Sequence, residues 1–119
     1  MQTVQARNET KGLPLADRVT VATSIWSRFW GLMGRAKLDD GHGIHITPCS
    51  SIHMFFMRFA IDVIFLDKSN KVTKVVHEIK PWRMALGRGG HSALELPVGA
   101  ASVARVEVGD VIDFSAASA

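Results

Sequence analysis

The chain has 119 residues, of which 47% are hydrophobic and 21% charged, with a formal net charge of +3. This length supports a single domain, and the composition excludes a disordered or fibrous protein. One cysteine cannot form an intramolecular disulfide framework, and charged residues keep every apolar run below the ~20 residues that span a bilayer. Since the polar N-terminus also lacks a secretory signal, we expect a soluble, cytoplasmic domain over residues 1–119, with its core at 18–114 and flexible ends.

The first predicted elements are a strand and a helix. Residues 18–22 alternate polar and apolar side chains, which is typical of a strand. In residues 23–33 the apolar side chains recur at three- and four-residue spacing and form one stripe, which predicts a helix. Thr23 or Ser24 can cap its start and Gly34 its end. We expect the aromatic stripe to face the core rather than a partner.

The strongest core signal is CSSIHMFFMRFAIDVIFLD at residues 49–67, which follows a short predicted strand at 43–47 that ends at Pro48. Two apolar runs of strand length stand here back to back, with a bend expected at residues 58–60. A polar turn follows, and residues 71–79 should return as the second strand of a hairpin.

The rest of the chain is expected to consist of short strands and turns. Residues 80–91 read as a loop, 93–96 as a strand, 103–108 as an extended segment or a short helix, and 111–114 as the last strand before a frayed SAASA tail. The pattern predicts a mainly β fold, a small antiparallel distorted barrel or sandwich of about seven strands with one short helix near the N-terminus.

Several motifs, weak singly, gain specificity from their order. They are GLMGR at residues 31–35, a glycine-led strand at Gly43, MRFAIDVIFLD at 57–67, LELPVG at 94–99 and VGD at 108–110. Together they resemble the bacterial and archaeal family called domain of unknown function 192, over residues 19–114. The resemblance implies a mainly β barrel or sandwich with a short helix, and it supplies no reaction. Many relatives carry a signal peptide or lipoprotein anchor that this sequence does not show, and Phe56 stands where many have Trp.

Four side chains are of types that bind zinc or copper: those of His42, His45, Cys49 and His53. Residues three apart in a strand point to opposite faces, so His42 and His45 should diverge. A structural zinc needs four ligands, and we therefore expect no metal and no other cofactor.

Cys49 close to His53 also permits nucleophilic catalysis, with the histidine as general base. No recognisable signature surrounds Cys49, and a lone buried thiol usually behaves as a small hydrophobe. A thiol- or histidine-dependent enzyme is therefore kept as an alternative to a protein without catalytic activity.

The glycine-rich loop at residues 80–91 holds Trp82, Arg83 and Arg88, residue types that can bind single-stranded nucleic acid. Its GRGG sequence lacks the spacing and the lysine of a phosphate-binding P-loop. We expect a solvated loop with Trp82 packed onto the barrel, and no nucleic-acid partner. Weak binding of an anionic polymer through the basic surface of residues 68–88 is a further alternative.

Arg58 and Asp62 are charged residues in an otherwise apolar stretch, where an unpaired charge would be costly. Glu95 is the expected partner of Arg58. We expect Asp62 to accept hydrogen bonds from backbone amides or from a basic side chain, with Arg58 and Arg83 as candidates. A polar pocket for a ligand is the alternative role for these charges.

The sequence thus predicts a non-catalytic β-barrel module that binds a small ligand or serves as an accessory domain. Its partner is expected to be a small molecule or a protein rather than a membrane, and its oligomeric state is open. The candidate ligand-binding residues are His53, Arg58, Asp62, Trp82 and Glu95.

Overall fold

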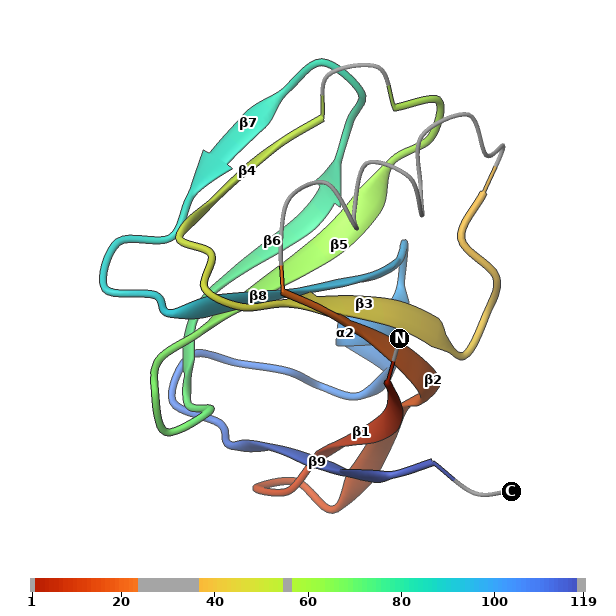
Figure 1. Ribbon diagram of the computed structural model, residues 1–119, viewed down its shortest axis with the longest axis vertical. Helices are drawn as coiled ribbons and strands as arrows, with labels where there is room; N and C mark the ends of the chain where they lie inside the picture. Colours follow the sequence, from red (N-terminus) through yellow and green to blue (C-terminus); the bar gives the residue numbers. More distant parts are fainter. Residues whose placement is uncertain (1, 24–36, 55–56, 118–119) are drawn as a thin grey trace.

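Strands dominate the structure, a computed structural model that describes residues 2–23, 37–54 and 57–117 (Figure 1). In this described part the strands are β1 (Thr3–Asn8), β2 (Leu13–Ala22), β3 (His42–Ile46), β4 (Ser51–His53), β5 (Ile61–Leu66), β6 (Val72–Ile79), β7 (Met84–Leu86), β8 (Ser92–Pro97) and β9 (Ile112–Ala116). The helix described there is α2 (Ala100–Val103), which is near the C-terminal end. No helix in these ranges is long and apolar enough to cross a membrane.

Seven of these strands form one curled sheet in the order β6-β5-β8-β3-β2-β1-β9 (Figure 1). Neighbouring strands are antiparallel except β2 and β3, which are parallel. The curl brings the starts of the two edge strands together, since Lys71 bridges to Val111 and the Val72 N–H donates to the Asp110 carbonyl at 2.7 Å. The predicted mainly β, barrel-like fold is confirmed, and the sheet is a half-barrel.

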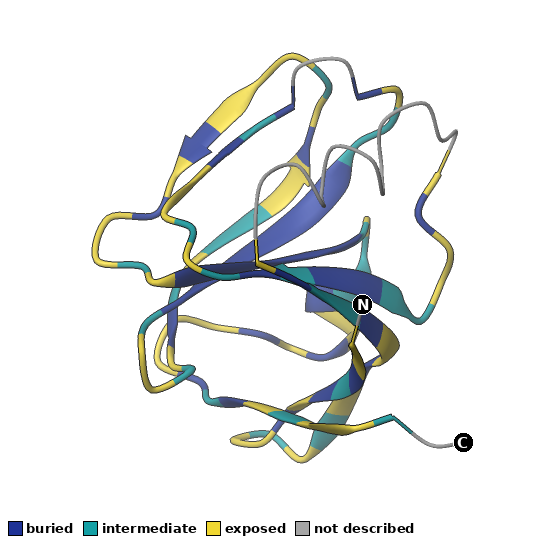
Figure 2. Ribbon diagram, viewed as in Figure 1, coloured by how far each residue is buried: buried dark blue, intermediate teal, exposed yellow. Residues whose placement is uncertain are grey.

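Strand β5 is buried along its whole length because both faces of the sheet are covered at this position (Figure 2). Ile64 and Leu66 belong to a cluster shared with β1, β2, β9 and α2. Val63 and Phe65 point to the other face, where a second cluster includes residues of β4 and β7. Strands β4 and β7 form a separate two-stranded sheet, here called the β4–β7 ribbon. The ribbon therefore covers the core on this face of the half-barrel.

The hairpin and the bend expected around β5 are both present. β5 pairs antiparallel with β6, and the chain bends at residues 58 and 59 before β5 begins. The two apolar runs that flank this bend do not pair with each other, because β4 pairs with β7. The predicted strands at 18–22, 43–47, 71–79, 93–96 and 111–114 correspond to β2, β3, β6, β8 and β9.

The two ends of the chain depart from the sequence prediction. The polar N-terminal arm is strand β1, which pairs with both β2 and β9. Ser115 and Ala116, expected in a frayed tail, pair with Gln5 and Val4. The sheet therefore extends beyond residues 18–114 at both ends. Alternate positions of β1 are buried, but they are filled by valine, alanine and asparagine. Because two of these side chains are small or polar, the sequence does not show the apolar alternation that predicts a strand.

Three further predictions differ from the structure or lie outside it. The predicted loop at 80–91 contains strand β7. Of the segment 103–108, expected to be extended or a short helix, Val103 is the last residue of α2 and residues 104–108 form turns and irregular structure. Of the helix predicted at 23–33, only Thr23 is among the described residues.

Candidate functional site

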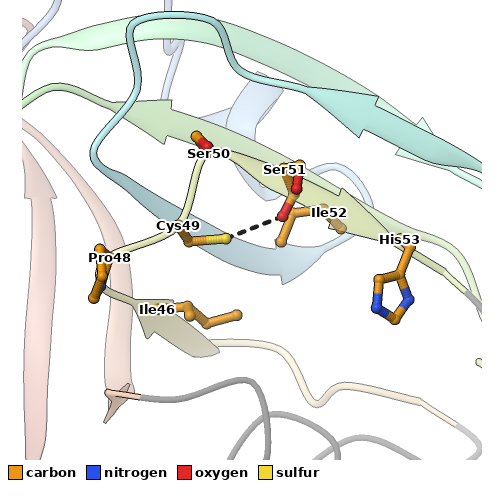
Figure 3. A pocket seen from close by; sticks show the side chains of 7 residues that line it. All are labelled: Ile46, Pro48, Cys49, Ser50, Ser51, Ile52 and His53. Carbon is orange, nitrogen blue, oxygen red and sulfur yellow. Dashed lines mark hydrogen bonds between the residues drawn. The ribbon is translucent and has the colours of Figure 1, made fainter.

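A pocket of about 210 Å³ lies where the chain leaves β3 and enters β4 (Figure 3). Its floor combines apolar side chains with a thiol, two hydroxyls and an imidazole. The lining residues are Ile46, Pro48, Cys49, Ser50, Ser51, Ile52 and His53. Pro48 follows the end of β3, and the chain turns there. Cys49 and His53 therefore line one pocket, in agreement with the sequence prediction that a turn at Pro48 could bring them together. We call it the Pro48–His53 pocket.

Cys49 lies in this pocket with its sulfur directed towards β4 (Figure 3). Its Sγ donates a hydrogen bond to the Ser51 carbonyl oxygen at 3.1 Å, and its N–H donates to the His91 carbonyl at 2.8 Å. Cys49 is half-buried, and these two bonds fix its position at the wall of the pocket.

His53 is half-buried and lies directly across from Met84 in the β4–β7 ribbon. The next residue, Met54, connects it to a second candidate, because the Trp82 N–H donates to the Met54 carbonyl at 2.8 Å. Trp82 itself is 59% exposed, so the prediction that it packs onto the barrel is wrong. His53 therefore lies in the ribbon, and Trp82 lies in the turn that leads into its second strand, β7.

Asp62 is only 1% exposed and accepts three backbone hydrogen bonds. One oxygen accepts from the Glu78 N–H at 2.9 Å, and the other accepts from Gly99 at 3.0 Å and Ala101 at 3.2 Å. Gly99 is the N-cap of α2 and has no side chain to cap it, so Asp62 supplies the cap from another strand. The prediction that Asp62 accepts from backbone amides is confirmed, and these bonds make it an anchor of the fold.

The Glu78 N–H is available because β6 bulges opposite Asp62. Ile61 pairs with Ile79 and Val63 with Val76, so β6 has one residue more than β5 between these pairs. Glu78 has a φ of 52°, which turns its N–H away from a regular ladder. The carboxylate therefore stabilises the bulge and the start of α2 together.

Glu95 and Asp62 lie on opposite faces of the sheet. Glu95 is fully buried and pairs with Val63 on β5 and Ile44 on β3, whereas Asp62 pairs with Leu96. Paired residues share a face, which places Glu95 on the side covered by the β4–β7 ribbon. These two predicted site residues do not meet in one site.

Arg58 lies in the bend before β5 and is exposed. The prediction that its charge is buried among apolar residues is wrong, because the bend turns it out of the core that the neighbouring residues enter. Glu95 as the partner of Arg58 stays a prediction.

The imidazole of His45 packs across the half-barrel. It stacks on Phe114 of β9, with ring centroids 4.3 Å apart, and its Nε2 lies 2.9 Å from the Ser92 hydroxyl. Burial, together with the charge of nearby His91, lowers the pKa of His45 from 6.5 to about 4. Among the described residues, no three His, Cys, Asp or Glu side chains form a group that could hold a metal.

The lowered pKa of His45 predicts a pH-dependent stability. Below about pH 6.5 His45 becomes protonated in the unfolded chain, whereas in the folded chain it stays neutral until about pH 4. The free energy of unfolding should therefore fall as the pH decreases across that range. We expect His45→Gln, which can still bond Ser92, to show a smaller loss than the parent in urea denaturation at about pH 7.5 and about pH 4.5. Exposed His77→Gln is the control; if it flattens the pH dependence as much as His45→Gln does, His45 is not the group responsible.

Sequence reasoning did not find the serines and the isoleucines of the Pro48–His53 pocket. Pro48 and Ser50 lie in the turn between β3 and β4, and Ser51 begins β4. This polar stretch between two apolar segments is the signal that could have shown a pocket wall. Which side chains face the cavity depends on how β4 lies over the sheet, and β4 is placed by its pairing with β7.

Comparisons with known proteins agree with the fold. The model of the family DUF192, described as Uncharacterized ACR, matches residues 5–114. A UPF0127 protein of Thermococcus sibiricus is 39% identical over 90% of this chain and 72% of its own, and one of Pyrococcus abyssi is 36% identical over 90% and 94%. A solved protein of unknown function from Novosphingobium aromaticivorans has a TM-score of 0.77 at 20% identity, covering 93% of this chain and 83% of its own.

Proposed function

The chain belongs to the DUF192 family, and we propose that it is a non-catalytic module that binds a small ligand in the Pro48–His53 pocket. The observation that carries the proposal is the convergence in this pocket of an apolar floor with a thiol, hydroxyls and an imidazole. Binding sites typically combine apolar walls with a few polar groups that orient the ligand. The single cysteine, which has no disulfide partner within the chain, supports a cytoplasmic location.

The pocket's size and lining restrict the ligand. At about 210 Å³ it lies below the roughly 300–1,000 Å³ of drug-sized sites, so it suits a compound of a few non-hydrogen atoms. The described residues that line it include no Lys, Arg, Asp or Glu, which favours an uncharged compound. Ile46 and Ile52 would contact its apolar part, and the His53 ring and the serine hydroxyls would hydrogen-bond its polar part.

Hydrogen bonding of the Cys49 thiol supports binding over catalysis. A catalytic cysteine needs thiolate character, whereas this Sγ donates its proton to a carbonyl oxygen. We expect iodoacetamide to modify Cys49 more slowly than it modifies glutathione at the same pH. Modification faster than glutathione would instead favour the thiol-dependent enzyme.

Ligand binding is tested by titrating the protein with a fragment library while recording amide chemical shifts. We expect neutral fragments to shift the amides of residues 46–53 in a saturable way. Cys49→Met, which fills the pocket, should abolish these shifts, whereas Cys49→Ser keeps a donor for the Ser51 carbonyl and should preserve them. If no fragment shifts these amides, or if both variants behave alike, the pocket is not the binding site.

A further inference from the structure

Strand β7 and the turn that leads into it expose large apolar side chains on the outside of the β4–β7 ribbon. Trp82, Met84 and Leu86 are 59%, 61% and 53% exposed, while Ala85 between the last two is buried against the core. Figure 2 shows β7 as largely exposed. Strands at the edge of a sheet seldom keep such side chains in water unless they meet a partner. We call Trp82, Met84 and Leu86, with the backbone that carries them, the β7 surface.

The backbone of β7 is open on the side away from β4. The Arg83 carbonyl accepts from Met54 and the Gly87 N–H donates to Ser50, so the odd-numbered residues face β4. By the alternation of an antiparallel pair, the N–H and C=O of Met84 point to the opposite edge. Within the described residues, β4 is the only strand that pairs with β7.

One position of that edge is already occupied by a lysine. The Lys74 ammonium on β6 donates to the Leu86 carbonyl at 2.8 Å. A lysine at a strand edge discourages unselective pairing, and it also offers a charge to a carboxylate that approaches the same edge. This lysine would therefore favour an acidic strand over a basic one at the same edge.

The segment of the chain that contains the β7 surface, residues 68–91, is basic. Among residues 68–91, Glu78 is the one exposed carboxylate. The exposed basic residues there are Lys68, Lys71, Lys74, Lys80, Arg83 and Arg88. Four of these six are bound to or close in sequence to β7: Lys74 through its bond to Leu86, and residues 80, 83 and 88 along the chain. The charge complement of this surface is an acidic partner.

We propose that the β7 surface docks an extended acidic segment of a partner protein, which adds as a strand to the open edge of β7. Its backbone bonds the N–H and C=O of Met84, and its alternate apolar side chains lie beside Met84 and Leu86. Carboxylates on its other face meet Lys74 and Arg83. The site is distinct from the Pro48–His53 pocket, although His53 lies across the ribbon from Met84.

Other occupants fit the surface less well. A bilayer offers no partner for the open backbone groups of Met84, which makes insertion costly. Single-stranded nucleic acid binds by stacking on aromatic platforms, and Trp82 is the one exposed aromatic side chain among the described residues. A second copy of this chain would bring two basic surfaces together.

The probe is a capped peptide of alternating glutamate and valine, titrated into the full chain at low salt. We expect amide shifts at residues 82–88 and slowed hydrogen exchange of the Met84 N–H, with weaker binding as salt increases. The same peptide with N-methylated backbone amides, and a lysine–valine peptide, should bind at least roughly ten-fold more weakly. Equal binding of either control peptide overturns the proposal.

Variants of the chain test which residues bind the peptide. Lys74→Glu with Arg83→Glu should weaken binding of the glutamate–valine peptide by roughly ten-fold or more. The matched control, Lys37→Glu with Arg105→Glu, makes the same charge change at exposed residues elsewhere and should leave affinity within roughly two-fold. Met84→Ser with Leu86→Ser should also lose binding without loss of stability, because both side chains are exposed. Loss of binding in the control pair, or binding of phosphatidylglycerol vesicles or single-stranded DNA but not of the peptide, overturns it.

Discussion

Gly87→Ala should be among the most destabilising single-methyl additions in this chain. A Cβ at Gly87 would lie 2.3 Å from two ring carbons of Phe65, which is fully buried in β5. The glycine cannot move away easily, because its N–H donates to Ser50 and its carbonyl accepts from Gly90. Overpacking typically costs 1–3 kcal/mol, and since neither side can yield here we expect a loss of about 3 kcal/mol or more in urea denaturation.

Gly89→Ala is the matched control for this prediction, two residues away in the same loop. Gly89 has a φ of +75° and nothing within 4 Å of its ideal Cβ position, so only backbone strain of about 1 kcal/mol is expected. The steric origin is tested by combining Gly87→Ala with Phe65→Leu, which should cost less than the sum of the two single variants. Additive effects would mean that Gly87 is required for a reason other than contact with the Phe65 ring.

Asp62→Ala should destabilise the fold by about 3 kcal/mol or more, because it orphans the N–H groups of Glu78, Gly99 and Ala101 at a buried position. Each unsatisfied buried donor costs about 1–3 kcal/mol, although water entering the space lowers the total. Chemical denaturation gives the free energy, and hydrogen exchange should accelerate at these three amides first.

Asp62→Asn tests whether the hydrogen bonds of the carboxylate, rather than the volume of the side chain, stabilise the fold. Its amide oxygen can still accept from Gly99 and Ala101, while its NH₂ group would face the Glu78 N–H, so its loss should be smaller than that of alanine. Asp113→Ala, at an exposed position of β9, is the control and should stay within about 0.5 kcal/mol of the parent. A parent-like Asp62→Ala would show that the carboxylate does not anchor the fold and would restore it as a candidate ligand-binding residue.

Local pattern was enough to identify the central hairpin. Residues 61–66 form an apolar run interrupted only by Asp62, and residues 71–79 are rich in valine after a polar turn. Burial of β5 on both faces follows from the absence of alternation in residues 61–66. The edge strands β1 and β9 were harder, because their partners are distant in sequence and their buried positions hold small side chains. Strand β7 was missed for another reason: glycines and basic residues surround three residues that become a strand only through pairing with β4.

Some features of the candidate site residues could be predicted from the sequence, and others could not. The sequence by itself indicated that Asp62 must have partners, because a carboxylate between isoleucine and valine in a core strand would otherwise be too costly. It also determined the mainly β class and the family, through motifs whose order is visible in the chain. Which amides satisfy Asp62, that Arg58 turns outward, and that Glu95 and Asp62 face opposite sides were decided by tertiary structure alone. These facts depend on a bulge in β6, a bend before β5 and the register of β5 with β8, and each is set by contacts between residues far apart in the sequence.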